Sequence, residues 1–239
     1  MLDILEAEGE GAARTISDRL YLRLRRSILL LELAPGQELV IKALAEELGV
    51  SRSPLRDALL RLAKESLVDI LPQQGTRVSR IDLERVDEER FLRASLEEKA
   101  LGLFVASFRS EASLRRLGGI LDAQGASMGK GDYRAFLDGD DEFHGVFFEA
   151  AGKSLCWDLV QGMSGHYRRV RLLNLRGPET AEAIHREHGE LLGLVRSGDE
   201  EGSLRAIRAH LSKILVEEER LRGEYPEYFV ARRRLAREA

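Results

Sequence analysis

The stretch from Leu44 to Leu62 constrains the fold of this chain more than any other part of the sequence. Its first half carries apolar residues at helical spacing, and Gly49 then supplies the left-handed conformation that a tight turn between helices requires. The second half repeats apolar residues at i, i+3, i+4 and i+7, namely Leu55, Ala58, Leu59 and Leu62. The pattern predicts two short helices joined by a glycine turn, with Ser51 capping the second helix.

The opposite face of the second helix is polar and basic at its N-terminal end, where Arg52, Ser53 and Arg56 stand. Arginine binds guanine edges or phosphate bidentately, and a helix N-terminus adds the positive end of its dipole. A DNA-binding helix-turn-helix presents its contact groups in this way. An ordinary pair of helices with a solvated basic face has the same turn pattern, so both interpretations stay open at this point.

The residues that follow favour DNA binding. Residues 68–71 are typical of a short strand, residues 72–75 of a turn, and residues 76–79 of a returning strand. A hairpin directly after a recognition helix is a wing. In that position Gly75 and Arg77 would approach the DNA backbone or the minor groove.

Residues 24–78 resemble the winged helix of GntR-family transcription regulators. The motifs that carry the resemblance are Pro35-Gly36, Leu44-Ala45-Glu46, Gly49-Val50-Ser51-Arg52, Pro54-Leu55-Arg56-Asp57-Ala58-Leu59 and Gly75-Thr76. The resemblance implies basic DNA contacts from Lys42, Arg52 and Arg56, contacts to phosphate or a base edge from Ser51 and Ser53, and a wing contact at Gly75. Ser66 departs from the family pattern, which usually has glycine after the recognition helix, and this departure concerns the geometry of the helix end.

The composition indicates a soluble, helix-rich protein of 239 residues, of which 44% are apolar and 33% charged. The single cysteine, Cys156, excludes an internal disulfide, and no apolar run approaches the ~20 residues that cross a bilayer. We therefore expect a cytoplasmic protein with no membrane partner. Residues 14–80 carry twelve Lys/Arg against eight Asp/Glu, and residues 81–239 carry 25 against 29. A basic module joined to an acidic one suits a DNA-binding protein with a separate regulatory half.

We predict a mostly α fold in two domains: a winged helix-turn-helix at residues 14–80 and an all-α bundle of six or seven helices at residues 85–225. Thr15 and Asp18 form the pattern of a capping box before a first helix that should end near Leu33. After residue 84 every segment has helical periodicity, and the expected helices are Val86–Ser107, Ser110–Met128, Asp132–Ala151, Ser154–Leu175, Glu179–Arg196 and Asp199–Arg222. Short glycine-containing breaks predict antiparallel neighbours, and we expect Tyr225–Phe229 to pack on the bundle.

Four residues of the helical half suggest a metal site. Asp140 and His144 are four apart, so a helix places both on one face at a spacing that suits two ligands of one ion. His188 and His210 stand midway along two later helices. Three inward imidazoles and one carboxylate would suit a divalent ion with positions left for ligand or water. Two plainer interpretations stay open, since inward histidines are commonly hydrogen-bonded core residues and Asp–His pairs at this spacing are commonly surface ion pairs.

Residues 85–222 resemble the FCD domain of the FadR subfamily. The matching motifs are Phe136 to His144, Glu149 to Gly152, Glu187-His188, Gly198-Asp199 and Ala209-His210-Leu211. In metal-binding members of that domain one Asp and three His hold the ion, and those positions match Asp140, His144, His188 and His210. The resemblance thus implies a divalent metal ion, and zinc and nickel are the two ions that we expect. Asp141 is the nearest alternative carboxylate, but it lies three residues before His144 rather than four.

The segment from Ser164 to Arg171 is unusually polar for a helix of such a bundle. Arg168 and Arg171 have the reach to bind the carboxylate of a small organic acid bidentately, and His166 lies in the same segment. We take these three as the candidate effector-binding residues. For either arginine, an exposed basic face is the alternative.

Together these features predict a transcription regulator. By resemblance it should be a homodimer that binds a pseudo-palindromic, double-stranded DNA operator, as a repressor or an activator. Its helical domain should bind a metal ion and a small carboxylate effector that modulates operator binding. Two alternatives are a regulator that senses the metal alone and a metal-dependent enzyme fused to a DNA-binding head. We do not expect an enzyme, because no nucleophile or poised base stands out beyond the candidate ligands.

Overall fold

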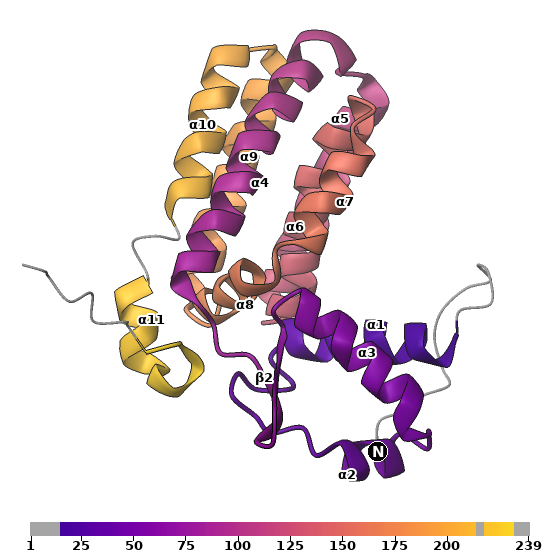
Figure 1. Ribbon diagram of the computed structural model, residues 1–239. Helices are drawn as coiled ribbons and strands as arrows, with labels where there is room; N and C mark the ends of the chain where they lie inside the picture. The colour runs from indigo at the N-terminus through magenta and orange to yellow at the C-terminus, as the bar shows by residue number, and fades with distance from the viewer. Residues whose placement is uncertain (1–14, 214–217, 232–239) are drawn as a thin grey trace, which may run out of the picture. The chain divides into compact units, whose positions relative to one another are not determined.

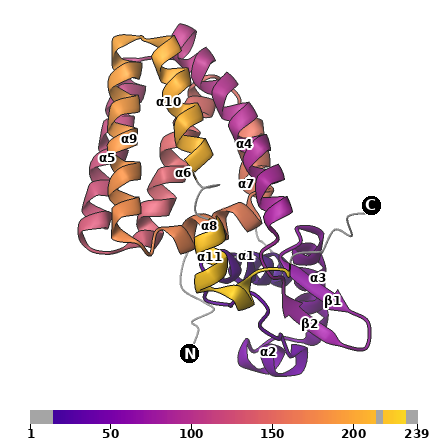
Figure 2. The same cartoon turned by 90° about the vertical axis from the view of Figure 1, so that its left-hand side faces the viewer.

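The computed structural model describes residues 15–213 and 218–231, apart from the side chain of Pro178, and the chain forms two compact units (Figures 1 and 2). The first unit contains residues 15–81 together with 227–231. The second contains the described residues between 82 and 226. The predicted fold class is confirmed, because the first unit is a helix-turn-helix with a two-stranded wing and the second is entirely helical.

The first unit consists of α1 (Ile16–Leu29), α2 (Ile41–Glu47), α3 (Arg52–Lys64), β1 (Val68–Leu71) and β2 (Gly75–Val78). The predicted capping box is present: Asp18 N donates to Thr15 Oγ1 at 3.1 Å and Thr15 N donates to Asp18 Oδ2 at 3.0 Å. Helix α1 ends at Leu29, earlier than the predicted Leu33, because Leu31 takes a left-handed conformation with φ 57°.

The core of this unit forms between α1 and α3. Leu20, Leu24 and Ile28 of α1 and four apolar residues of α3 are all at most 4% exposed, the latter being Leu55, Ala58, Leu59 and Leu62. Burying each large side chain stabilises the fold by roughly 1.5–3 kcal/mol. Gly49 has φ 64°, as the turn between α2 and α3 requires. The prediction that the Ser51 side chain caps α3 is wrong: Ser51 is the N-cap residue, but its exposed hydroxyl makes no cap hydrogen bond.

The wing is an antiparallel hairpin whose register pairs Val68 with Val78 and Leu71 with Gly75. The returning strand therefore begins one residue before the predicted position. Residues 226–228 form a short 3-10 helix, and the chain then returns to this unit, where Ile81 N donates to Tyr228 O at 2.8 Å. The predicted packing of residues 225–229 on the bundle holds for Tyr225, whose ring centroid lies 5.2 Å from the Arg176 guanidinium. Phe229 is buried beside Ile81 instead.

The second unit consists of long helices joined by short breaks. The elements are α4 (Leu83–Leu103), a π-helical turn (Phe104–Phe108), α5 (Glu111–Gly129), α6 (Tyr133–Ala150), α7 (Ser154–Gly162), α8 (Gly165–Asn174), α9 (Pro178–Ser197), α10 (Glu200–Ser212) and α11 (Glu218–Glu224). Helix α5 packs on α6 and α9, and α10 packs on α9 and α4 (Figure 2). Among the described residues, no helix combines the length and apolar character needed to span a membrane.

Two predicted helices of this unit are each divided in the structure. The helix predicted at Ser154–Leu175 is α7 followed by α8, because Gly162 and Gly165 weaken the helix on both sides of Met163 and Ser164. The break lets α8 turn a polar face inward. The helix predicted at Asp199–Arg222 is α10 followed by α11, and residues 214–217 of that prediction lie outside the described residues. The unit therefore has more helices than the six or seven predicted.

The end of the recognition helix carries an unusual backbone conformation. Ser66 follows the C-cap of α3 and has φ 58°, a left-handed conformation that glycine adopts without steric cost. Its carbonyl accepts a hydrogen bond from Ser79 Oγ at 2.5 Å, which ties the helix end to the strand after the wing. The departure at Ser66 thus leaves the helix end intact, at the steric cost of a Cβ in a left-handed residue.

We predict that Ser66→Gly is more stable than Ser66→Ala by about 1 kcal/mol. Both variants remove the same hydroxyl, so their difference isolates the cost of a Cβ in the left-handed conformation. Urea unfolding of the full chain, followed by circular dichroism, measures the two free energies. Equal stabilities would mean that Ser66 does not need the left-handed conformation.

Candidate metal centre and nucleic-acid interface

The first turn of α3 exposes the residues predicted to contact DNA. Arg52, Ser53 and Arg56 are exposed on one side of the helix, opposite its buried leucines, and Lys42 of α2 is exposed as well. Within residues 15–213 and 218–231, neither Arg52 nor Arg56 has an ion-pair or hydrogen-bond partner. Their guanidinium groups are therefore available to an anionic partner such as DNA.

The wing presents its two predicted residues differently. Gly75 is exposed and has φ 104°, so the tip of the hairpin adopts a conformation suited to glycine. Arg77 is half-buried and forms an ion pair with Asp69 of the neighbouring strand, with 3.1 Å between Nε and Oδ2. Arg77 must therefore share its charge with Asp69 in any contact to phosphate.

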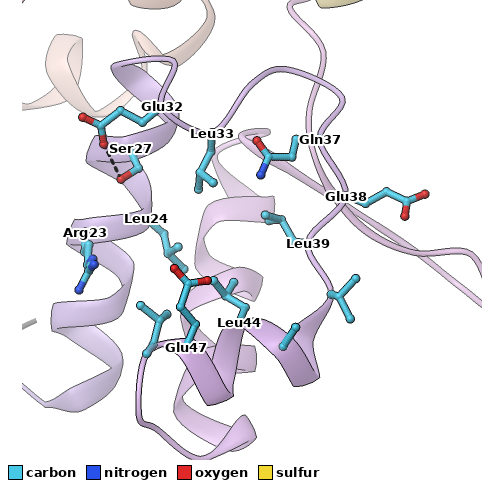
Figure 3. Close-up of a pocket in the computed structure, with 13 residues that line it drawn as sticks. Arg23, Leu24, Ser27, Glu32, Leu33, Gln37, Glu38, Leu39, Leu44 and Glu47 are labelled. Atoms are coloured by element: carbon cyan, nitrogen blue, oxygen red, sulfur yellow. Dashed lines mark hydrogen bonds between the residues drawn. The ribbon is translucent and has the colours of Figure 1, made fainter. Parts of the chain in front are cut away.

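A pocket of about 560 Å³ lies beside the helix-turn-helix, between α1, α2 and the loop before α2 (Figure 3). Leu24, Leu33, Leu39 and Leu44 give it an apolar lining, and Ser27 donates to Glu32 across a distance of 2.9 Å within it. None of the predicted site residues lines this pocket. Its remaining charged groups, Arg23, Glu32, Glu38 and Glu47, are of mixed sign and form no cluster of metal ligands.

The helical unit brings the four candidate metal ligands together. Asp140 and His144 come from α6, His188 from α9 and His210 from α10, and one donor atom of each lies within 4.8 Å of all the others. Asp140, His144 and His188 are at most 2% exposed, and His210 is half-buried. The Asp140–His144 pair is therefore an interior feature, which excludes the surface ion pair among the plainer interpretations.

Each of the three imidazoles is held at its Nδ1 atom by a polar side chain outside the cluster. His188 Nδ1 lies 2.9 Å from Gln124 Oε1, and His210 Nδ1 lies 2.8 Å from Glu187 Oε2. His144 Nδ1 lies 2.7 Å from Glu97 Oε2, an ion-pair distance without the alignment of a hydrogen bond. Because these partners are acceptors, they favour a proton on Nδ1 and leave the Nε2 lone pair free.

The Nε2 atoms of His144 and His188 are buried and have no hydrogen-bond partner among the described residues. Their nearest carboxylate oxygens belong to Asp140, at 3.9 Å from His144 Nε2 and 3.6 Å from His188 Nε2. A buried polar atom without a partner costs about 1–3 kcal/mol, and a metal ion would satisfy both lone pairs at once. These unpaired nitrogens therefore fit a divalent ion, whereas the interpretation as hydrogen-bonded core histidines accounts only for the Nδ1 side of the rings.

The protonation states also suit a metal ion. Burial lowers the pKa of His188 well below its usual range and lowers that of His144, so both are neutral near pH 7. Burial alone would raise the pKa of Asp140, but Arg171 and the neighbouring histidines hold it well below its usual range. Neutral imidazoles and an ionised carboxylate are the forms that coordinate divalent ions.

Three arginines lie beside the cluster. Arg171 is buried, contacts Asp140 through Nη2, and places Nη1 2.7 Å from Asp141 Oδ1. Arg168 forms ion pairs with Asp141 and with Asp138. Arg93 of α4 is buried, with its Nη1 atom 3.3 Å from Asp141 Oδ1. Two of the candidate effector residues, Arg168 and Arg171, thus lie next to the candidate metal ligands rather than on an exposed basic face.

His166, the third candidate effector residue, faces another part of the unit. Its Nδ1 accepts a hydrogen bond from Asp82 N at 3.0 Å, at the N-cap of α4. The backbone N–H groups of His166 and Tyr167 donate to Glu89 Oε2 at 2.9 and 2.8 Å. Hydrogen bonds of His166 therefore connect the N-terminal end of α8 to the N-terminal end of α4.

Arg93, Glu97 and Gln124 were not among the residues predicted for the site. Phe91, a large apolar residue of α4, is 68% exposed. The inward face of α4 instead carries Glu89, Arg93 and Glu97 at i, i+4 and i+8, all at most 5% exposed. Charged residues at this spacing are equally common on a solvated helix face, so no signal in the sequence distinguished these three residues.

Comparison with known proteins agrees with both halves of this architecture. Residues 16–78 match the family described as bacterial regulatory proteins, gntR family, and residues 90–213 match the FCD domain. An HTH-type transcriptional regulator in an unstable DNA locus of Streptomyces ambofaciens is 35% identical over 216 residues, or 90% of each chain. The HTH-type transcriptional repressor RspR of Escherichia coli K12 is 28% identical over 214 residues, or 90% of this chain and 93% of RspR.

A solved structure supports the same fold. E. coli McbR/YncC superposes with a TM-score of 0.72 at 22% identity, over 89% of this chain and 100% of that chain. The matched families and the two regulators span nearly all the elements described above. The chain therefore belongs to the GntR family of bacterial regulatory proteins, with a C-terminal FCD domain as in the FadR subfamily, and is a DNA-binding transcription regulator rather than an enzyme.

Proposed function

We propose that this regulator binds a pseudo-palindromic operator as a homodimer and that a small carboxylate effector, bound beside a divalent metal ion, modulates its affinity for DNA. The proposal rests on the buried Nε2 atoms of His144 and His188, which have no hydrogen-bond partner in the part of the chain that the structure describes and which lie near the Asp140 carboxylate. The residues that would hold the ion are Asp140, His144, His188 and His210. Zinc and nickel both suit a set of imidazoles with one carboxylate.

The effector half of the proposal rests on the arginines. When bound, the ion would supply positive charge and open coordination positions for a carboxylate. Arg168 and Arg171 would bind a further acid group of the same ligand, because guanidinium forks match carboxylates in geometry and charge. The ion pair between Arg171 and Asp140 supports this role, because Asp140 is one of the proposed metal ligands. His166 would position α8 rather than touch the effector, since its ring nitrogen accepts from Asp82.

The DNA-binding half of the proposal rests on α3. Arg52 and Arg56 would contact bases or phosphate in the major groove, with Lys42, Ser51 and Ser53 at its border and Gly75 in the wing. A pseudo-palindrome requires a two-fold dimer, so two copies of α3 would bind two half-sites. We propose repression as the regulatory sense because the related E. coli protein is named as a repressor.

A second candidate function is direct sensing of the metal without an organic effector. The same four ligands would serve it, but it leaves the arginines without a part in regulation. Release of operator DNA by an added acid at constant metal concentration supports the effector function. Release by metal alone, with no response to acids, would support the metal sensor.

We predict that Arg52→Ala and Arg56→Ala each weaken specific operator binding by roughly 1–3 kcal/mol, more than they weaken binding to random DNA. The reason is that a side chain that reads a base loses discrimination as well as affinity. Lys64→Ala serves as the control, since Lys64 is exposed on the last turn of the same helix. Fluorescence anisotropy at fixed salt measures all variants, and wild-type affinity in both arginine variants would exclude α3 as the recognition helix.

We predict that His188→Ala lowers the metal content of the purified protein from about one ion per chain to near zero. His185→Ala is the matched control, because His185 lies on the same helix and contacts Leu121 O instead of the cluster. Both variants should remain folded, since the apolar core of the unit is extensive. Asp140→Asn should lose less metal, because an amide oxygen still coordinates weakly.

Metal analysis together with operator release tests the link between metal and regulation. The His188→Ala variant should lose its response to acids and still bind DNA. Metal content should also fall on acidification, since protons compete for the imidazoles. Full metal content and a normal response in His188→Ala would replace this site with purely structural histidines.

We predict that dimerisation resides in the helical half. Residues 81–239 expressed alone should sediment as a folded helical dimer at micromolar concentration, and residues 1–80 should bind an isolated half-site only weakly. Analytical ultracentrifugation measures the first and anisotropy the second. A monomeric helical fragment would place the dimer contact elsewhere.

A further inference from the structure

Asp141 is the carboxylate on which Arg93, Arg168 and Arg171 converge. It receives Nη1 of Arg171 at 2.7 Å, Nη1 of Arg93 at 3.3 Å, and Nη1 of Arg168. The residue is 9% exposed. A ligand carboxylate placed at this point would find the same guanidinium groups arranged around it.

The charged side chains around Asp141 pair with one another. Three cations, Arg93, Arg168 and Arg171, face three buried anions, Glu97, Asp140 and Asp141. Asp138 also pairs with Arg168, but its side chain is 62% exposed and strongly solvated. Each of these guanidinium groups therefore already contacts a resident carboxylate, and an acid group that binds at the same nitrogens must take the place of that carboxylate.

Of the three anions, Asp141 is the one that can give way. Glu97 is fully buried and held by Arg93 Nε at 2.5 Å, with His144 2.7 Å away on its other oxygen. Asp140 belongs to the candidate metal ligands. The side chain of Asp141 is 12% exposed, as is that of Arg168 beside it, so both lie nearer to solvent than Glu97 and Arg93.

We propose that Asp141 is a resident competitor for the effector, which must displace it from Arg168 and Arg171. The inference rests on the proposed function, because it assumes that an acid binds in this region. It also defines the ligand class: a compact acid with two carboxylates, one directed toward the histidine cluster and one replacing Asp141. An acid with a single carboxylate leaves Asp141 in place and gains only the first contact.

The test compares Asp141→Asn with Asp138→Asn in the zinc-loaded full chain. Asp138 is the matched control because it lies on the same helix and also pairs with Arg168, but is exposed. Succinate and acetate are the probes, and isothermal titration calorimetry gives their affinities. Fluorescence of Trp157, the single tryptophan, gives a second signal because its ring lies 5.7 Å from the Arg93 guanidinium.

Removing the competitor should tighten succinate binding about tenfold or more, because the guanidinium nitrogens that contacted Asp141 then bind the ligand without competition from that carboxylate. Asp138→Asn should change the affinity by less than about threefold, as expected of an exposed ion pair. The gain for acetate should be smaller than the gain for succinate. Metal content should equal that of the wild type in both variants, because neither residue is a candidate ligand.

A second comparison guards against misfolding of Asp141→Asn. The double variant Arg168→Gln/Asp141→Asn loses one cation and one anion, so the remaining charges around the site stay equal in number. Its reference is the single variant Arg168→Gln. Removal of Asp141 should tighten succinate binding in this background too, through Arg93 and Arg171. Unchanged or weaker succinate binding on removal of Asp141 in both backgrounds, with zinc fully bound, would overturn the inference.

The outcomes separate this inference from the function on which it rests. If zinc-loaded wild type binds succinate and Asp141→Asn binds it no better, the competitor role fails and the effector site stands. If no variant binds either acid, the effector function itself fails. If wild type does not respond while Asp141→Asn binds succinate, the competitor role is supported in its strongest form.

Discussion

The helical unit depends on one buried network of charges, in which Arg93 is the central cation. Arg93 is 2% exposed and contacts Glu97, Asp140 and Asp141 from α4, while Arg171 contacts the two aspartates from α8. Desolvating any one of these ions costs several kcal/mol, which only pairing with the others offsets. Although burial raises the pKa of Glu97, Arg93 and His144 lower it to about 2, so the network stays ionised at neutral pH. Helices α4, α6 and α8 are therefore held in one mutual arrangement, and that arrangement places Asp140.

The same packing orients the histidines. Phe143 stacks on His188 with ring centroids 4.5 Å apart, and Phe147 contacts His144 edge-on at 6.3 Å. These aromatic rings confine the imidazole planes, and Glu97, Gln124 and Glu187 fix their Nδ1 atoms. Five helices thus contribute to the cluster, although only three of them supply its candidate ligands, and this surrounding support leaves the cluster little positional freedom.

Helix α8 has two attachments within the helical unit. Arg168 and Arg171 contact the aspartates of α6, and His166 with Tyr167 contacts the first turns of α4 through Asp82 and Glu89. Asp82 follows Ile81, the last residue of the first unit before the chain enters the bundle. These two sets of contacts restrict the position of α8, since a movement at one end of the helix would strain the hydrogen bonds at the other. The break between α7 and α8 makes these attachments possible by letting the polar face of α8 turn inward.

Local sequence by itself determined the helix-turn-helix, the wing and the pairing of Asp140 with His144, because each depends on residues a few positions apart. Gly49 specifies the turn between α2 and α3. The spacing of the leucines in α3 determines which face of that helix is buried, whatever element it packs against. Only the tertiary structure decided that His188 and His210 meet that pair, since their convergence depends on how α6, α9 and α10 pack. It also decided that Glu97 is buried and Phe91 exposed, against their hydrophobicity. A charged stripe has the same sequence pattern whether it faces water or opposite charges, and only the packing of α4 against α6 and α8 brings the opposite charges to it.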